Sequence, residues 1–282
     1  MTAADAAAVT AVVQAANDDA ARQAGRVPQS HSEADRRNFE LAMARFAQRD
    51  GGGAWVAESE DGSVVGMAEA IRRGGFWGLS MLFVDPAWQG QGVGRGLLAG
   101  ALRYAEGASV RMIVSSSDPR AMRRYWSAGL AMHPAVEASG PVAPATLPSV
   151  IRGRPGDGDD LALVGEVDAV LRGSRAEDVA FLLSSGCELA VVDGPEGQGY
   201  VLWRSDRLQM LGATDEDVAK MLLWRFLSSC AGPATLPWIT SAQQWAVDVA
   251  MTARMTFRLN GALFVSGLDH PPGPWLPSGW FF

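Results

Sequence analysis

The sequence predicts a protein of the mixed α and β class, built as two tandem halves. The first indication is residues 79–98, where an apolar run of strand length, a glycine-dense loop and a helical pattern follow one another without a gap. The second is that the order of helices and strands in the first half returns loosely in residues 150–266. The third is the length of 282 residues, which suits two domains of about 140 each, or one large domain.

The first half reads as two helices, a hairpin, a central strand and a second strand with a helix on either side. Ser32 and Asp35 have the spacing of a helix cap, and Asp61-Gly62 forms a hairpin turn. Proline cannot donate to a strand ladder, so Asp85-Pro86 ends the central strand. The expected elements are helices at 3–24 and 33–50, strands at 54–58, 64–72 and 79–84, a helix from Val93, a strand at 110–115 and a helix from Asp118-Pro119.

The glycine-dense loop has the layout of an anion site. Gly90, Gly92 and Gly94 allow a close approach of the backbone, and the N–H groups of the following helix point at whatever lies there. A P-loop is excluded, because it needs a lysine after its last glycine and the chain has a single lysine, Lys220. A dinucleotide fingerprint, Gly94-Arg95-Gly96-Leu97-Leu98-Ala99 with Asp118 about 20 residues on, fits but places its glycines inside the helix.

A third pattern, Gln-x-x-Gly-x-Gly, is met at every position by residues 89–94. With the preceding Leu-x-Val-x-Pro at residues 82–86, this sequence resembles the GNAT family of acyl-CoA-dependent N-acetyltransferases. The resemblance implies a central, mostly antiparallel twisted sheet flanked by helices, with the loop binding the pyrophosphate of acetyl-CoA. The cofactor-binding residues that it implies are Phe83, Val84, Gln89, Gly90, Gln91, Gly92, Val93, Gly94, Arg95, Gly96, Asp118 and Ala121.

A second family pattern follows at the expected separation. Asp118 begins a helix that carries Ala121 and Tyr125, and Gly129-Leu130 closes it, with leucine in place of the family's phenylalanine. The resemblance implies that Tyr125 protonates the departing thiolate, and that a backbone N–H of Phe83 or Val84 polarises the thioester.

The base that takes the amine proton stays open. Glu58, Glu69, His133 and a chain of water molecules are the candidates. The first strand of the family fold is also missing, because the chain offers no residues for it before the first helix.

The proline-rich segment 138–149 predicts a linker, which places one domain at 1–137 and a second at 150–282. Where the second half should carry its glycine loop, it has Asp215-Glu216-Asp217, and carboxylates repel a pyrophosphate. We therefore expect a GNAT-like second domain without a cofactor. The aromatic tail, residues 271–282, should pack in a groove between the domains or against a partner, or form a lid over the substrate.

Composition sets limits on partners and location. A net charge of −7 argues against nucleic acid, although Arg120, Arg123 and Arg124 crowd one helix, as a solvated face or as contacts to phosphates. No apolar run is long enough for a bilayer, and the N-terminus lacks a secretory signal, so we expect a cytoplasmic protein with no membrane partner. One lysine beside 23 arginines indicates a GC-rich bacterial genome. Two cysteines and three scattered histidines predict no metal site.

The function that these patterns favour is transfer of an acetyl group from acetyl-CoA to a primary amine of a small molecule, or less readily of a peptide. The transfer would be direct, in a ternary complex, by a monomer or homodimer. A non-catalytic acyl-CoA sensor and a dinucleotide-dependent enzyme are the alternatives. The sequence does not identify the acceptor.

Overall fold

The structure, a computed structural model, describes residues 1–171 and 173–282, without the side chain of Leu171. By their contacts these residues form two compact units. The first unit contains residues 1–72 and 77–108, and the second contains residues 73–76 and 109–282.

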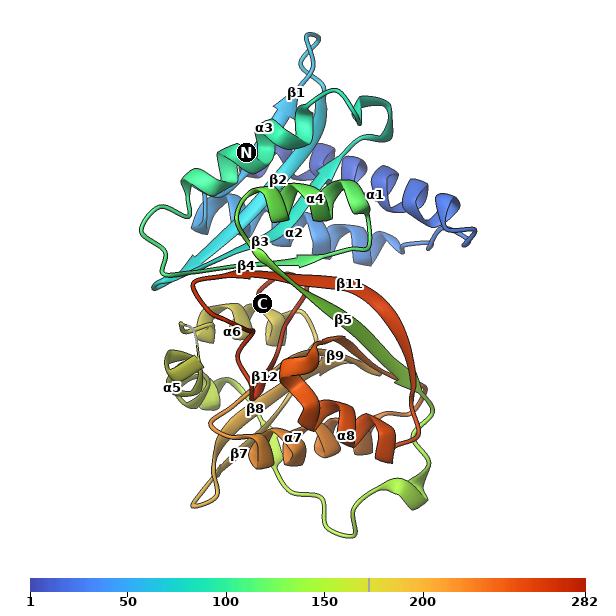
Figure 1. Cartoon of the computed structure of the whole chain (residues 1–282), viewed down its shortest axis with the longest axis vertical. Helices are drawn as coiled ribbons and strands as arrows, with labels where there is room; N and C mark the ends of the chain where they lie inside the picture. Colours follow the sequence, from blue (N-terminus) through green and yellow to red (C-terminus); the bar gives the residue numbers. More distant parts are fainter. Residues whose placement is uncertain (172) are drawn as a thin grey trace. The chain divides into compact units, whose positions relative to one another are not determined.

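The first unit has the elements that the sequence predicts. Helices α1 (Ala6–Gln23) and α2 (Glu33–Arg49) precede an antiparallel hairpin, and Ser32 and Asp35 form the expected capping box of α2. In the described part of the chain a short 3₁₀ turn, and no strand, precedes α1, as predicted. The strands and the last helix are β1 (Trp55–Glu58), β2 (Val64–Arg73), β3 (Phe76–Val84) and α3 (Val93–Arg103) (Figure 1).

A glycine that sequence reasoning missed sets the position of α3 over the sheet. A Cβ atom at Gly66 of β2 would lie 2.9 Å from Leu97 and 3.1 Å from Val93, both on α3. Because the side chains of α3 fill the space where a Cβ would stand, the helix packs closely on β2. The first turn of α3 is therefore held next to the end of the central strand β3.

The second unit is an α/β arrangement around a mostly antiparallel sheet. Its strand order is β4-β11-β5-β10-β9-β8-β7-β6, with β12 paired to β9. The elements are β4 (Val110–Ser115), α4 (Pro119–Ser127), β5 (Ala131–Gly140), β6 (Arg154–Gly156), α5 (Leu161–Leu171), α6 (Ala176–Ser184), β7 (Glu188–Gly194), β8 (Gly197–Arg204), β9 (Arg207–Ala213), α7 (Glu216–Ser229), β10 (Ala234–Ile239), α8 (Gln244–Thr252), β11 (Thr256–Ser266) and β12 (Trp275–Leu276).

The last strands of the two predicted halves are interleaved. β11, from the second half, pairs antiparallel with β4 on one side and with β5 on the other. β5, from the first half, pairs in turn with β10. Figure 1 shows β5 and β11 as two long strands side by side. Each half thus places a strand between two strands of the other.

The first three residues of the predicted linker at 138–149 belong to a strand. β5 continues to Gly140, and Ala138 is fully buried, opposite Leu236 of β10 and Phe257 of β11. The segment lacks strong strand formers, so its strand character comes from its two neighbours rather than from local preference. The placement of the domain boundary near residues 137–150 stays a prediction, and the short strands β6 and β12 were not predicted.

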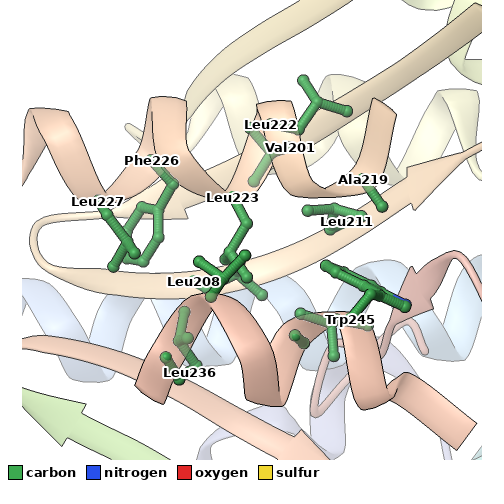
Figure 2. Close-up of a cluster of buried hydrophobic side chains, with 14 of the residues drawn as sticks. Val201, Leu208, Leu211, Ala219, Leu222, Leu223, Phe226, Leu227, Leu236 and Trp245 are labelled. Atoms are coloured by element: carbon green, nitrogen blue, oxygen red, sulfur yellow. The ribbon is translucent and has the colours of Figure 1, made fainter. Parts of the chain in front are cut away.

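A core of buried apolar side chains lies beneath α7 (Figure 2). Apolar side chains of α7 face β8 and β9, and Trp245 of α8 and Leu236 of β10 close the other side. This core holds helix α7 against the strand β9 that leads into it. Its labelled members are Val201, Leu208, Leu211, Ala219, Leu222, Leu223, Phe226, Leu227, Leu236 and Trp245.

The second unit also contains buried ion pairs. The guanidinium of Arg175 binds Asp168, with Nη2 2.7 Å from Oδ1, and the Tyr200 hydroxyl donates to the same Asp168 oxygen at 2.6 Å. Nearby in sequence, Asp178 of α6 accepts two hydrogen bonds from Arg73, at 2.7 and 2.9 Å. Buried charges need such partners, because an unpaired ion loses its hydration without compensation.

Candidate functional site

The glycine loop begins where β3 ends, and local hydrogen bonds fix its entry. The N–H of Asp85 donates to the carbonyl of Val65 on β2 at 2.9 Å. The Asp85 carboxylate accepts from the N–H of Ala87 at 2.9 Å and so begins a 3₁₀ turn at Pro86–Trp88. The chain therefore leaves the sheet along a defined path.

Both loop glutamines turn their side chains back onto the loop. The Gln89 amide donates to the Val84 carbonyl at 3.1 Å, and the Gln91 amide donates to the Ala87 carbonyl at 3.0 Å. These bonds brace the turn between β3 and α3. The contribution of the two glutamines to an anion site is thus the shape that they give the loop.

The glycines leave the start of α3 open. Gly90 and Gly92 have φ angles of +81° and +93°, which L side chains rarely adopt, and a Cβ at either position would meet nothing within 4 Å. Gly92 is the N-cap of α3, and no side chain caps that helix. The first turn therefore directs backbone N–H groups and the positive end of the helix dipole toward an unfilled space.

The other predicted loop residues are already in or beside α3. Val93 is half-buried, Gly94 is buried, and Arg95 and Gly96 are exposed. Because Gly94 and Gly96 lie inside the helix, the dinucleotide fingerprint does not form a loop here. Phe83 and Val84 are half-buried at the end of β3. Their role at the thioester stays a prediction.

Helix α4, in the second unit, carries the second family pattern. Asp118 caps it by accepting from the N–H of Arg120 at 2.8 Å, and also binds the Arg120 side chain at 2.9 Å. Burial raises the pKa of Asp118, but the hydrogen bonds and charge of Arg120 outweigh it, so that the pKa is lowered overall. Asp118 is thus an ionised helix cap, and Ala121 lies half-buried one turn further.

Tyr125 is buried on α4 against a strand of the other half. Its ring meets that of Phe264, on β11, edge to face with centroids 5.5 Å apart. Burial raises the pKa of the Tyr125 hydroxyl, Arg124 lowers it and Asp118 raises it, with a net increase. The hydroxyl is therefore protonated at neutral pH, as an acid must be before it reacts.

The three side chains considered as bases differ in environment. Glu58 is exposed at the end of β1, whereas Glu69 is fully buried in β2. His133, on β5, is half-buried, and its pKa is lowered by burial and by the charge of His270. A lowered pKa keeps His133 neutral at physiological pH, which a base requires.

In the second half, α7 is the helix that corresponds to α3, and a side chain caps its first turn. Asp215 caps α7, and its carboxylate accepts from the N–H groups of Asp217 at 2.9 Å and Val218 at 3.0 Å. The donors that a phosphate would need are therefore occupied by a group of the same charge sign. The start of α7 thus has a side-chain cap, whereas the start of α3 has none.

Further features of the described residues concern metals, cysteines and membranes. Among residues 1–171 and 173–282 no three His, Cys, Asp or Glu side chains gather as they would around a metal ion. Cys187 and Cys230 are free thiols. In the same part of the chain, every helix is too short or too polar to cross a bilayer.

Comparisons with known proteins agree with this geometry. Residues 13–129 match the profile of the acetyltransferase (GNAT) family. A solved structure from Pyrococcus horikoshii, assigned as an acetyltransferase, covers all of this chain and 94% of its own, at 12% identity and a TM-score of 0.76. A search of curated proteins finds no match.

Two further solved structures have the same arrangement. A GCN5-related N-acetyltransferase from Sphaerobacter thermophilus matches 94% of this chain and 93% of its own, at 16% identity and a TM-score of 0.57. A tandem GNAT protein of the clavulanic acid biosynthesis pathway matches 96% of this chain and 98% of its own, at 14% identity and a TM-score of 0.51. At such identities these likenesses concern the fold alone.

The fold and the family match agree on the class of protein that this chain resembles, the GNAT acetyltransferases. Residues 13–129 match the GNAT family of acetyltransferases, and the chain has a tandem GNAT fold over its length. The predicted family and fold class are confirmed.

Proposed function

We propose that the protein transfers an acetyl group from acetyl-CoA to a primary amine of a small molecule, directly in a ternary complex. The observation that carries this proposal is the uncapped start of α3, with Gly90 and Gly92 in conformations that leave room for an anion. A pyrophosphate suits this place, because it accepts hydrogen bonds from free N–H groups and is attracted by the helix dipole.

The proposal assigns the chemistry to few groups. The nitrogen of the uncharged amine attacks the thioester carbon, and the carbonyl oxygen gains negative charge that a backbone N–H of Phe83 or Val84 stabilises. As the carbon–sulfur bond breaks, the Tyr125 hydroxyl gives its proton to the leaving thiolate. The amine loses its proton to Glu58, Glu69, His133 or water. The proposed cofactor residues are those predicted from the sequence, with Gln89, Gln91 and Asp118 holding the loop and helix starts.

The test replaces Gly92 with aspartate. Gly92→Asp puts a carboxylate where the pyrophosphate should bind, and we expect the affinity for acetyl-CoA to fall at least ~100-fold, about 2.7 kcal/mol. Gly62→Asp is the matched control, because Gly62 also has a left-handed φ (+83°) with nothing within 4 Å of a Cβ. Both variants carry similar backbone strain, so a difference between them reports position. Calorimetry giving equal affinities for the two variants would remove this loop from the proposal.

A non-catalytic acyl-CoA sensor is the second candidate, since the sequence has an intact glycine loop but does not single out a base among Glu58, Glu69, His133 and water. Release of free thiol from acetyl-CoA with a panel of amines separates the two, because a sensor binds without turnover. For partners we propose a small-molecule amine and no nucleic acid, and a monomer in sedimentation experiments, with a homodimer as the alternative.

A further inference from the structure

β9 in the second half corresponds to β3 in the first half by its place in the order of elements. Each strand leads through a turn into a helix, β3 into α3 and β9 into α7. In the proposed mechanism, a backbone N–H at the end of β3 holds the thioester carbonyl. At the end of β9, the N–H of Ala213 donates to the carbonyl of Pro274 at 2.9 Å. The Pro274 carbonyl thus lies at the position that corresponds, in the first half, to the proposed position of the thioester carbonyl.

The tail enters the sheet as a strand. β12 pairs antiparallel with β9, with Trp275 opposite Gly212 and Leu276 opposite Leu211, and it also contacts β10. β9 and β10 are parallel and pair with each other only near their first residues, through Arg207 and Thr235. Toward the other end of β9, β12 occupies the place of the next strand.

Three successive carbonyls of the tail are bound by three different donors. The Gln243 side chain donates to Pro272 at 2.8 Å, the Trp245 indole donates to Gly273 at 2.8 Å, and Ala213 donates to Pro274. Gln243 and Trp245 are themselves buried. Proline has no N–H, so the segment Pro271-Pro272-Gly273-Pro274 presents mainly acceptors to a surface of donors.

Buried aromatic rings hold the rest of the tail. Trp275 and Leu276 are fully buried. The ring of Phe281 lies 6.2 Å from that of Phe181, and the ring of Phe282 lies 5.7 Å from that of Phe76, between centroids. The expectation of a partner surface or a lid is corrected here, because the tail packs into the core of its own unit and buries its apolar area there.

We propose that residues 272–276 fill, in the second half, the cleft that the acyl end of acyl-CoA enters in the first half. This inference rests on the proposed function. Two groups then block acyl-CoA binding in the second half. The tail occupies the position of the thioester, and the Asp215 carboxylate occupies the position of the pyrophosphate. The protein therefore binds one acyl-CoA for each chain.

Hydrogen exchange at two neighbouring amides tests the tail without any cofactor. Ala213 donates to the tail, whereas the N–H of Thr214 donates to Gln198 at 2.8 Å, on the β8 side. In the unmodified protein both amides should exchange slowly. Exchange of Ala213 as fast as the amides of the exposed turn 267–270 would overturn the proposal.

Trp275→Ala should release the tail locally. We expect exchange of Ala213 to rise at least ~10-fold while Thr214 stays protected. Trp280→Ala is the matched control, since Trp280 is half-buried outside β12 and its loss should leave Ala213 protected. An equal increase in the exchange rates of Ala213 and Thr214 would mean that the variant unfolds globally. The exchange rate of Ala213 in the unmodified protein then decides whether the tail protects this amide. Unchanged protection of Ala213 in a folded Trp275→Ala protein contradicts the proposal.

Calorimetric titration with acetyl-CoA gives the complementary count. One equivalent for each chain, lost in Gly92→Asp, supports both the proposed function and the closed second half. Two equivalents would show an open second half and overturn this inference alone. If acetyl-CoA does not bind, the proposed function is contradicted. The hydrogen-exchange experiment still tests whether the tail fills the cleft.

Discussion

Replacing Tyr125 with phenylalanine tests the mechanism rather than binding. The ring and its edge-to-face contact with Phe264 remain, and only the hydroxyl is removed. A phenol that protonates the sulfur helps only while the carbon–sulfur bond breaks, so its benefit belongs to the transition state. Tyr125→Phe should therefore lower kcat and leave the affinity for acetyl-CoA nearly unchanged.

The expected size follows from the environment of the hydroxyl. Positioned general acids contribute about 100- to 10,000-fold, and the contribution falls as the acid becomes weaker. Burial raises the pKa of Tyr125, so this acid is weaker than an exposed phenol. We therefore expect a loss of about 10- to 1000-fold, or ~1.4 to 4 kcal/mol at the transition state.

The assay is the rate of thiol release at saturating acetyl-CoA and amine, with single-turnover measurements to establish that chemistry is the slow step. The raised pKa also predicts the pH dependence. The protonated form persists to higher pH than in an ordinary tyrosine, so no loss of rate below about pH 10 should come from Tyr125. Trp126→Phe, at an exposed position of α4, is the control. Full turnover by Tyr125→Phe, with chemistry rate-limiting, would make Tyr125 a packing residue.

Two further predictions concern stability. Residues 150–282 expressed alone should aggregate or fail to unfold cooperatively. The reason is that β10 and β11 lose their neighbour β5 and expose unpaired strand edges. A soluble monomer with a cooperative unfolding transition would contradict this. Asp178→Ala should cost about 3 to 5 kcal/mol in urea unfolding, because it removes the carboxylate that balances buried Arg73. Glu33→Ala, which breaks an exposed pair with Arg37, should cost under ~1 kcal/mol, and equal losses would refute the argument.

The elements that the sequence predicts well are those with local causes. The Ser32 cap, the turn at Asp61-Gly62 and the change from strand to helix between Pro86 and Val93 each depend on residues a few positions apart. The same holds for the acid cap Asp215, whose carboxylate binds N–H groups two and three residues on. Such local signals are sufficient to predict the class of site.

The elements that the sequence did not predict depend on distant partners. Ala138 is in a strand because β10 and β11 lie on either side of it, and no pattern near Ala138 indicates them. Gly66 is required by side chains of α3 about 30 residues later. The tail has no strand pattern among its prolines, and β12 exists because Ala213, Gln243 and Trp245 bind its carbonyls. Tertiary contacts decided each of these.

The interleaving of β5 and β11 also governs the time at which the protein can fold on the ribosome. β4 waits for a neighbour, β11, that is synthesised roughly 150 residues later, or about 8 to 30 s at ~5–20 residues per second. During that interval the strands around Met112 and Ile113, both buried in the finished sheet, lack one partner. A nascent chain of this protein should therefore depend on chaperones longer than a single-domain relative whose strands all come from one half.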